Sequence, residues 1–68
     1  MSKSILTTRE REIFNLLIEG YVTKEISNEL NISEKTVRNH ISNVIQKLEV
    51  NTRYQAVIEL VKMDELKI

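Results

Sequence analysis

The chain has 68 residues, with 10 basic and 10 acidic side chains, one histidine and no cysteine. This length allows a single domain, here taken as residues 1–68. The absence of cysteine excludes disulfides and thiolate metal sites. Because so small a domain buries only about 60% of its unfolded surface, a partner subunit is the expected source of extra stability. No apolar run could form a membrane span or a signal peptide, so we expect a cytoplasmic protein.

Composition also argues against an enzyme. The chain has one histidine, one aspartate and no glycine-rich phosphate loop, and it is too short to enclose a substrate pocket. We therefore expect no catalytic residue, no metal and no cofactor.

Charge is unevenly distributed along the chain. Residues 35–53 contain four basic side chains and one acidic side chain, whereas residues 21–34 contain one basic and three acidic side chains. For binding to nucleic acid, the local charge matters more than the net charge of zero.

The first two predicted helices follow from caps and apolar spacing. Thr7 and Glu10 match a capping box, and Gly20 ends the helix that follows. The second helix is short, with Thr23 as its expected N-cap and Asn31 in the turn after it. Val, Ile and Leu recur at three- and four-residue spacing throughout, which predicts an all-α fold.

The third predicted helix begins after Ser33, and a buried stripe defines its two faces. The stripe comprises Val37, Ile41, Val44 and Leu48. The opposite face comprises Lys35, Arg38, Asn39, Ser42 and Gln46, which are basic or polar and include no carboxylate.

The fourth predicted helix begins near Thr52, which forms a second capping box with Gln55. One apolar stripe comprises Ala56, Leu60 and Met63. A second stripe comprises Tyr54, Val57, Ile58 and Val61. An outer helix needs only one buried stripe, so the second indicates a dimer interface or, alternatively, a surface covered by the N-terminal segment.

The second and third helices together predict a helix-turn-helix over residues 23–48. In this unit the later helix lies in the major groove. Arg38 can bind guanine with two hydrogen bonds, Asn39 can bind adenine in the same way, and Ser42 can bind either base type. The predicted phosphate contacts are Lys24, Lys35, Thr36, Asn43 and Lys47.

The linked motifs resemble the LuxR/FixJ-type helix-turn-helix domain over about residues 5–66. The matching segments are Leu6 to Glu12, Gly20, Lys24 to Ile26, Ile32 to Ile41, Lys47-Leu48, and Arg53 with Ala56-Val57. The resemblance implies a compact four-helix fold without a β wing, DNA readout by the third helix and dimerisation through the fourth, residues 52–64. Its stand-alone length implies a regulator that consists of this domain alone.

Three residues depart from the family pattern. Glu49 replaces a usual glycine and would be strained in a left-handed turn. Val22 replaces a usual serine or threonine, so we expect the capping box with Glu25 to be lost. Ser27 replaces a usual alanine, and its hydroxyl needs a partner such as the carbonyl one turn back.

These patterns predict a homodimeric, sequence-specific regulator bound to double-stranded DNA at the nucleoid, with RNA polymerase as a further candidate partner. The alternative is a protein-interaction module that titrates another regulator through its fourth helix. Two residue roles also stay open: His40 either packs against the fold or contacts phosphate, and Lys47 pairs either with phosphate or with a carboxylate.

Overall fold

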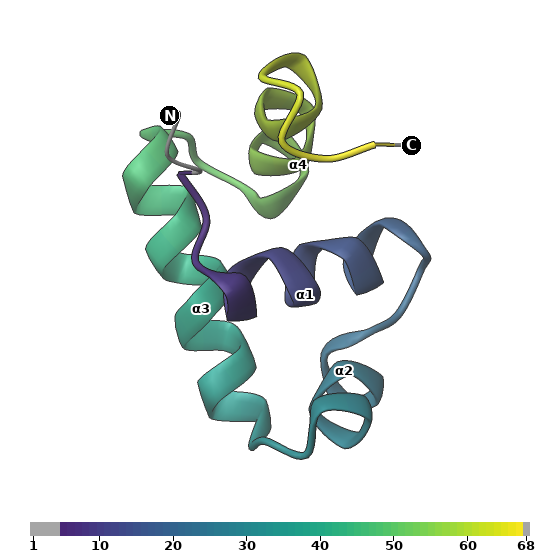
Figure 1. Cartoon of the computed structure of the whole chain (residues 1–68). Coiled ribbons are helices and arrows are strands. Elements are labelled where there is room, and N and C mark those ends of the chain that lie inside the picture. Colours follow the sequence, from purple (N-terminus) through teal and green to yellow (C-terminus); the bar gives the residue numbers. More distant parts are fainter. Residues whose placement is uncertain (1–4, 68) are drawn as a thin grey trace.

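A computed structural model describes residues 5–67 and contains four helices and no strand within them. The helices are α1 (Thr8–Ile18), α2 (Thr23–Leu30), α3 (Glu34–Leu48) and α4 (Arg53–Lys62). The predicted all-α, four-helix fold is therefore confirmed. Helix α1 crosses α3, α2 lies beside the beginning of α3, and α4 lies near its end (Figure 1). No helix within the described residues has both the length and the apolar character needed to cross a bilayer.

Helix α3 is central to the core because it packs against each of the other three helices. The stripe predicted for it is buried at Val37, Ile41 and Val44, whereas Leu48 is partly buried. The other helices contribute Ile13, Phe14, Ile26, Ala56 and Leu60, all with no exposed surface. Each large apolar side chain buried in this way stabilises the fold by about 1.5–3 kcal/mol. The polar face of α3 is consequently held toward solvent.

Side-chain caps begin three of the helices as predicted. The Thr7 hydroxyl accepts a hydrogen bond from the Glu10 amide (3.1 Å), and the Glu10 carboxylate accepts one from the Thr7 amide (2.9 Å). The hydroxyls of Ser33 and Thr52 accept hydrogen bonds from amides three residues later. The capping box predicted for Thr52 and Gln55 is only half formed, because the Gln55 side-chain oxygen accepts from the Asn51 amide (2.8 Å) and not from the Thr52 amide. These bonds satisfy amides that have no partner inside a helix.

The start of α2 differs from the prediction. Val22, not Thr23, occupies the N-cap position, and Thr23 is the first helical residue. Part of the capping box survives, because the Val22 amide donates to the Glu25 carboxylate at 2.9 Å. Valine has no side-chain acceptor, so its helix lacks the reciprocal bond. Further along α2, the Ser27 hydroxyl donates to the Lys24 carbonyl (2.7 Å), one turn back as expected.

A left-handed residue follows each of the four helices. Gly20 has φ 96°, Asn31 has φ 58°, Glu49 has φ 56° and Asp64 has φ 65°. At Gly20 and Glu49 the backbone forms the paired hydrogen bonds of a Schellman motif. Glycine and asparagine tolerate this conformation, whereas Glu49 bears the steric penalty anticipated from the sequence.

The C-terminal segment corrects one predicted core residue. Met63, placed in the buried stripe of α4, is 45% exposed because the helix ends at Lys62 and the chain reverses there. The amides of Glu65 and Leu66 both donate to the Leu60 carbonyl. Leu66 thereby takes the core position and is 2% exposed.

Candidate nucleic-acid interface

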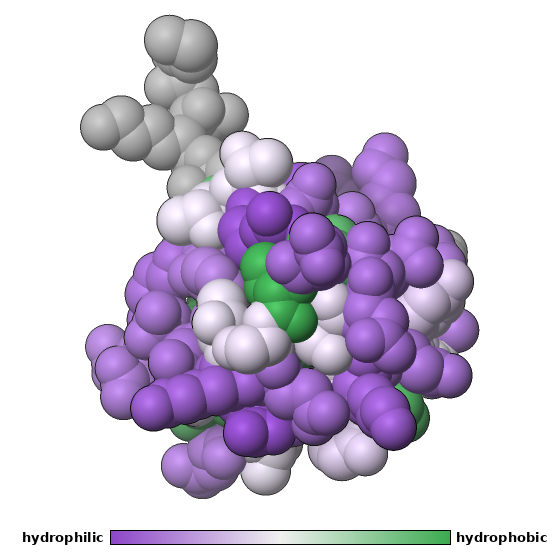
Figure 2. Space-filling model, turned by 90° about the horizontal axis from the view of Figure 1, so that it is seen from below, coloured by the Kyte–Doolittle hydropathy of each residue, from purple (hydrophilic) through white to green (hydrophobic). Residues whose placement is uncertain are grey.

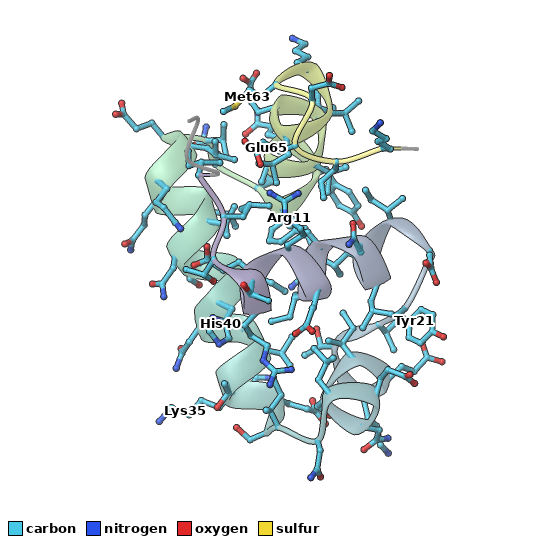
Figure 3. All side chains as sticks on the ribbon, viewed as in Figure 1. Arg11, Tyr21, Lys35, His40, Met63 and Glu65 are labelled. Carbon is cyan, nitrogen blue, oxygen red and sulfur yellow. The ribbon has the colours of Figure 1, made fainter. Side chains whose placement is uncertain are left out.

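The polar face of α3 is exposed along its length. Lys35, Arg38, Asn39, Ser42 and Gln46 are all solvent-exposed, as is Asn43 beside them. Lys35 points outward from the beginning of the helix (Figure 3). Because α3 packs its apolar stripe against three helices, its backbone is well supported while this face remains free. The three residues predicted to read bases therefore lie together on one supported surface.

The beginning of α3 provides the geometry of an anion site. The Ser33 hydroxyl donates to the Thr36 hydroxyl oxygen at 2.9 Å, which leaves the Thr36 hydroxyl hydrogen available to another acceptor. The first-turn amides of a helix favour a negative group nearby. Lys35 adds a cation in the same turn. These groups can bind a phosphate.

A carboxylate lies closer to this face than the sequence analysis assumed. Glu34 Oε1 is 3.6 Å from Arg38 Nη1, and both side chains are about half exposed. The expectation of an acid-free face was therefore wrong at its edge, because Glu34 precedes Arg38 by one helical turn. Such exposed pairs contribute only about 0.3–0.5 kcal/mol, so Arg38 can leave Glu34 for a base at little cost.

Lys47 is engaged with a carboxylate in this structure. Its Nζ donates to Glu10 Oε1 (2.5 Å) and to the Ile5 carbonyl (2.9 Å). Of the two alternatives for Lys47, the carboxylate pair is the one observed, and phosphate contact stays a prediction. Burial raises the pKa of Glu10, but hydrogen bonds from Lys47 and the Thr7 amide, with the charges of Lys47 and His40, hold it below its ordinary value.

The remaining predicted contacts lie at the margins of the α3 surface. Lys24 is exposed on α2. His40 is partly buried and lies on α3 near the start of α1, which agrees with a packing role (Figure 3). Neither observation tests contact with a phosphate.

Seen from the end of the molecule where α2 meets α3, the surface is mainly hydrophilic, with a small hydrophobic area near its centre and a few smaller ones toward its edges (Figure 2). A polar surface of this kind suits contact with the phosphates and base edges of DNA better than burial against an apolar partner.

The predicted dimer stripe on α4 is only half exposed. Tyr54 is 77% exposed and Ile58 is 53% exposed, whereas Val57 and Val61 are partly buried against the core. The exposed pair lies in a groove shared with the end of α1 and the turn before α2. Among the described residues, nothing covers this pair.

One tertiary interaction was not predicted from sequence. The Arg11 guanidinium donates to the Glu65 carboxylate (2.6 Å) and to the Glu65 carbonyl, which joins α1 to the C-terminal segment (Figure 3). The two residues are too far apart in sequence for helical spacing to pair them.

Comparison with known proteins identifies the domain. Residues 4–60 match the family model described as bacterial regulatory proteins, luxR family. The chain belongs to the luxR family. It is 63% identical to the spore germination protein GerE of Bacillus subtilis over 67 residues, covering 98% of this chain and 90% of GerE.

Several other relatives of this luxR-family chain are longer. It is 50% identical to the transcriptional regulatory protein DegU of Brevibacillus brevis, covering 94% of this chain but 27% of DegU. Among solved structures, the transcription factor GerE superposes with a TM-score of 0.93 over 96% of this chain and 97% of GerE, at 63% identity. The response regulator ChrA superposes with a TM-score of 0.85 over 97% of this chain and 33% of ChrA, at 29% identity.

These matches confirm the resemblance found in the sequence. The chain is a GerE-like regulator with a luxR-type DNA-binding domain. Its relatives are transcription regulators, which favours a regulator over an enzyme.

Proposed function

We propose that this luxR-family chain regulates transcription by binding a two-fold related DNA site as a homodimer, with α3 in the major groove. The observation that carries the proposal is the polar face of α3, exposed along its length while the opposite face is anchored in the core. A recognition helix needs both properties, because base readout requires side chains held in a defined register.

Each exposed side chain then has a role set by its chemistry. Arg38 binds guanine, Asn39 binds adenine, and Ser42, one turn after Arg38, binds either base. Lys35 and Thr36 bind a phosphate at the beginning of α3, and Lys24 and Asn43 bind the flanking backbone. The Lys47 ammonium group donates to the Glu10 carboxylate, so Lys47 contacts phosphate only when it leaves Glu10.

Dimerisation is assigned to α4, through Tyr54, Val57, Ile58 and Val61. Pairing two copies about a two-fold axis places their recognition helices one helical turn of DNA apart, about 34 Å. Bound in this way at the nucleoid in the cytoplasm, the dimer presents its remaining surface to RNA polymerase.

The test is selection from a randomised duplex pool. Fluorescence anisotropy at two salt concentrations, with sequencing of the bound fraction, measures both affinity and preference. We expect binding that weakens steeply with salt, since phosphate contacts release counterions, and enrichment of a palindromic site. Weak binding without an enriched site would reject DNA recognition and favour a module that binds another regulator through α4.

A further inference from the structure

Exposed apolar side chains are concentrated in one place on the molecule. Among residues 5–67, the large hydrophobic side chains most exposed to solvent are Val22, Tyr54, Ile58 and Met63. Three of them, all but Met63, line a single groove between the turn that precedes α2 and the beginning of α4. An exposed apolar surface of this kind indicates a protein contact.

Val22 is an unfavourable residue for its position in the isolated chain. It occupies the N-cap of α2, where a serine or threonine hydroxyl would accept a hydrogen bond from a free amide, yet its side chain makes none. It is also 59% exposed, so burial within the chain does not offset the missing cap. Nothing in the isolated chain therefore explains a valine at this position, whereas contact with another molecule would bury its side chain.

Charges at the edges of the groove indicate what that molecule is. Arg53 lines the groove on α4, and Glu19, Glu25 and Glu29 line the adjoining surface, which shares Gly20 and Tyr21 with the groove. The Glu25 carboxylate accepts the Val22 amide, but no ion pair joins any of these four charged side chains to another described side chain. An apolar centre flanked by one cation and by carboxylates is complementary to itself, which is what a two-fold contact between identical subunits requires.

We infer that the turn before α2, through Val22, forms one continuous homodimer surface with Tyr54 and Ile58 of α4. This inference rests on the dimer of the proposed function and adds to it a contact outside α4. Val22 caps the first helix of the helix-turn-helix, so contact at Val22 fixes the orientation of the DNA-binding unit as well as holding the subunits together. The spacing of half-sites thus depends on this turn.

The decisive variant is Val22→Ser, because its effects on folding and on dimerisation have opposite signs. Sedimentation equilibrium gives the dimer Kd of the full chain, free and on the selected duplex. We expect Val22→Ser to raise this Kd about tenfold, since each of two subunits loses a buried valine. In an Ile58→Ser background, where dimerisation is already weakened, the added serine cap should raise the Tm by about 4–8 °C.

Two further variants distinguish loss of the contact at Val22 from loss of the dimer as a whole. Ile58→Ser should weaken the dimer, and Met63→Ser, which removes an exposed side chain outside the groove, should leave its Kd unchanged. If Ile58→Ser weakens the dimer and Val22→Ser does not, the contact at Val22 is rejected and the α4 dimer stands. If the wild-type chain stays monomeric both free and on DNA, the homodimer and the contact at Val22 are both rejected.

Discussion

At the scale of single residues, base recognition depends most on Arg38. Its guanidinium is a rigid, two-pronged donor, whereas the ammonium of Lys35 acts as a point charge. The weak pair with Glu34 keeps the Arg38 side chain on the exposed face and still lets it move to a base. The two cations of this surface should therefore contribute differently to specificity and to affinity.

We predict that Arg38→Ala costs about 1–3 kcal/mol on the selected site and relaxes preference at one base pair. Lys35→Ala, its matched control, should weaken binding to all sequences alike and reduce the salt slope by about 1. Selection from the randomised pool with each variant measures both effects. Unchanged sequence preference in Arg38→Ala would reject its role as a base reader.

Glu49 allows a second residue-scale prediction, because its φ of 56° is strained for a side chain that bears Cβ. Replacement by glycine should stabilise the fold by up to about 1 kcal/mol, since relief of the left-handed strain exceeds the entropy that glycine gains on unfolding. Urea denaturation provides the measurement. Glu49→Ala, which removes the same charge and keeps the strain, is the control, and equal stability of the two variants would contradict the explanation.

At the scale of elements, α1 and α3 are joined by a charged contact as well as by the core. Lys47 near the end of α3 binds the carboxylate of Glu10 near the start of α1, and Glu10 is 4% exposed. Glu10 also caps its own helix through the Thr7 amide. One carboxylate therefore supports both the local helix start and the packing of two helices.

The lowered pKa of Glu10 makes this contact dependent on pH. Its contribution is fully present above the ordinary value of 4.5 and is lost as pH falls through the lower pKa of the folded chain. We predict that Glu10→Gln costs about 1–3 kcal/mol near pH 7. That cost should shrink as the pH falls below 4.5. Urea unfolding at several pH values tests this, and a cost that stays constant with pH would contradict it.

Sequence patterns predicted the elements well because helix starts and stripes are local. Thr7, Ser33 and Thr52 each bond an amide three residues later, so the sequence alone reveals them. The start of α2 was misplaced because Glu25 supports a backbone amide even where the cap is valine. Met63 was misplaced because apolar periodicity does not reveal where a helix ends.

At the scale of the whole molecule, the proposed dimer has a direct thermodynamic consequence. Association of folded subunits stabilises them by mass action, so we predict that the Tm rises with protein concentration. Differential scanning calorimetry over a hundredfold range of concentration measures the slope. Ile58→Glu should abolish the slope, because it places a charge in the α4 surface, and Met63→Glu should preserve it. A wild-type Tm independent of concentration would argue against a dimer.

The candidate site was partly predictable for a similar reason. The exposed face of α3 follows from helical spacing alone, so its residues could be named in advance. The partner of Lys47 could not, because Glu10 lies 37 positions away. The groove at Val22 joins two distant segments, and only the folded arrangement brings them together.

The contact between Arg11 and Glu65 has a consequence for the order of folding. The two residues are 54 positions apart, so their contact closes a loop that spans most of the chain. Helices form in about a microsecond or less. A loop this long closes later, because bringing distant residues together costs entropy before their contact stabilises the chain. Arg11→Met should therefore speed unfolding and leave the folding rate nearly unchanged in stopped-flow measurements, whereas slower folding would place this closure in the nucleus. If only the unfolding rate changes, the C-terminal segment is the last part of the chain to pack against a bundle that is already assembled.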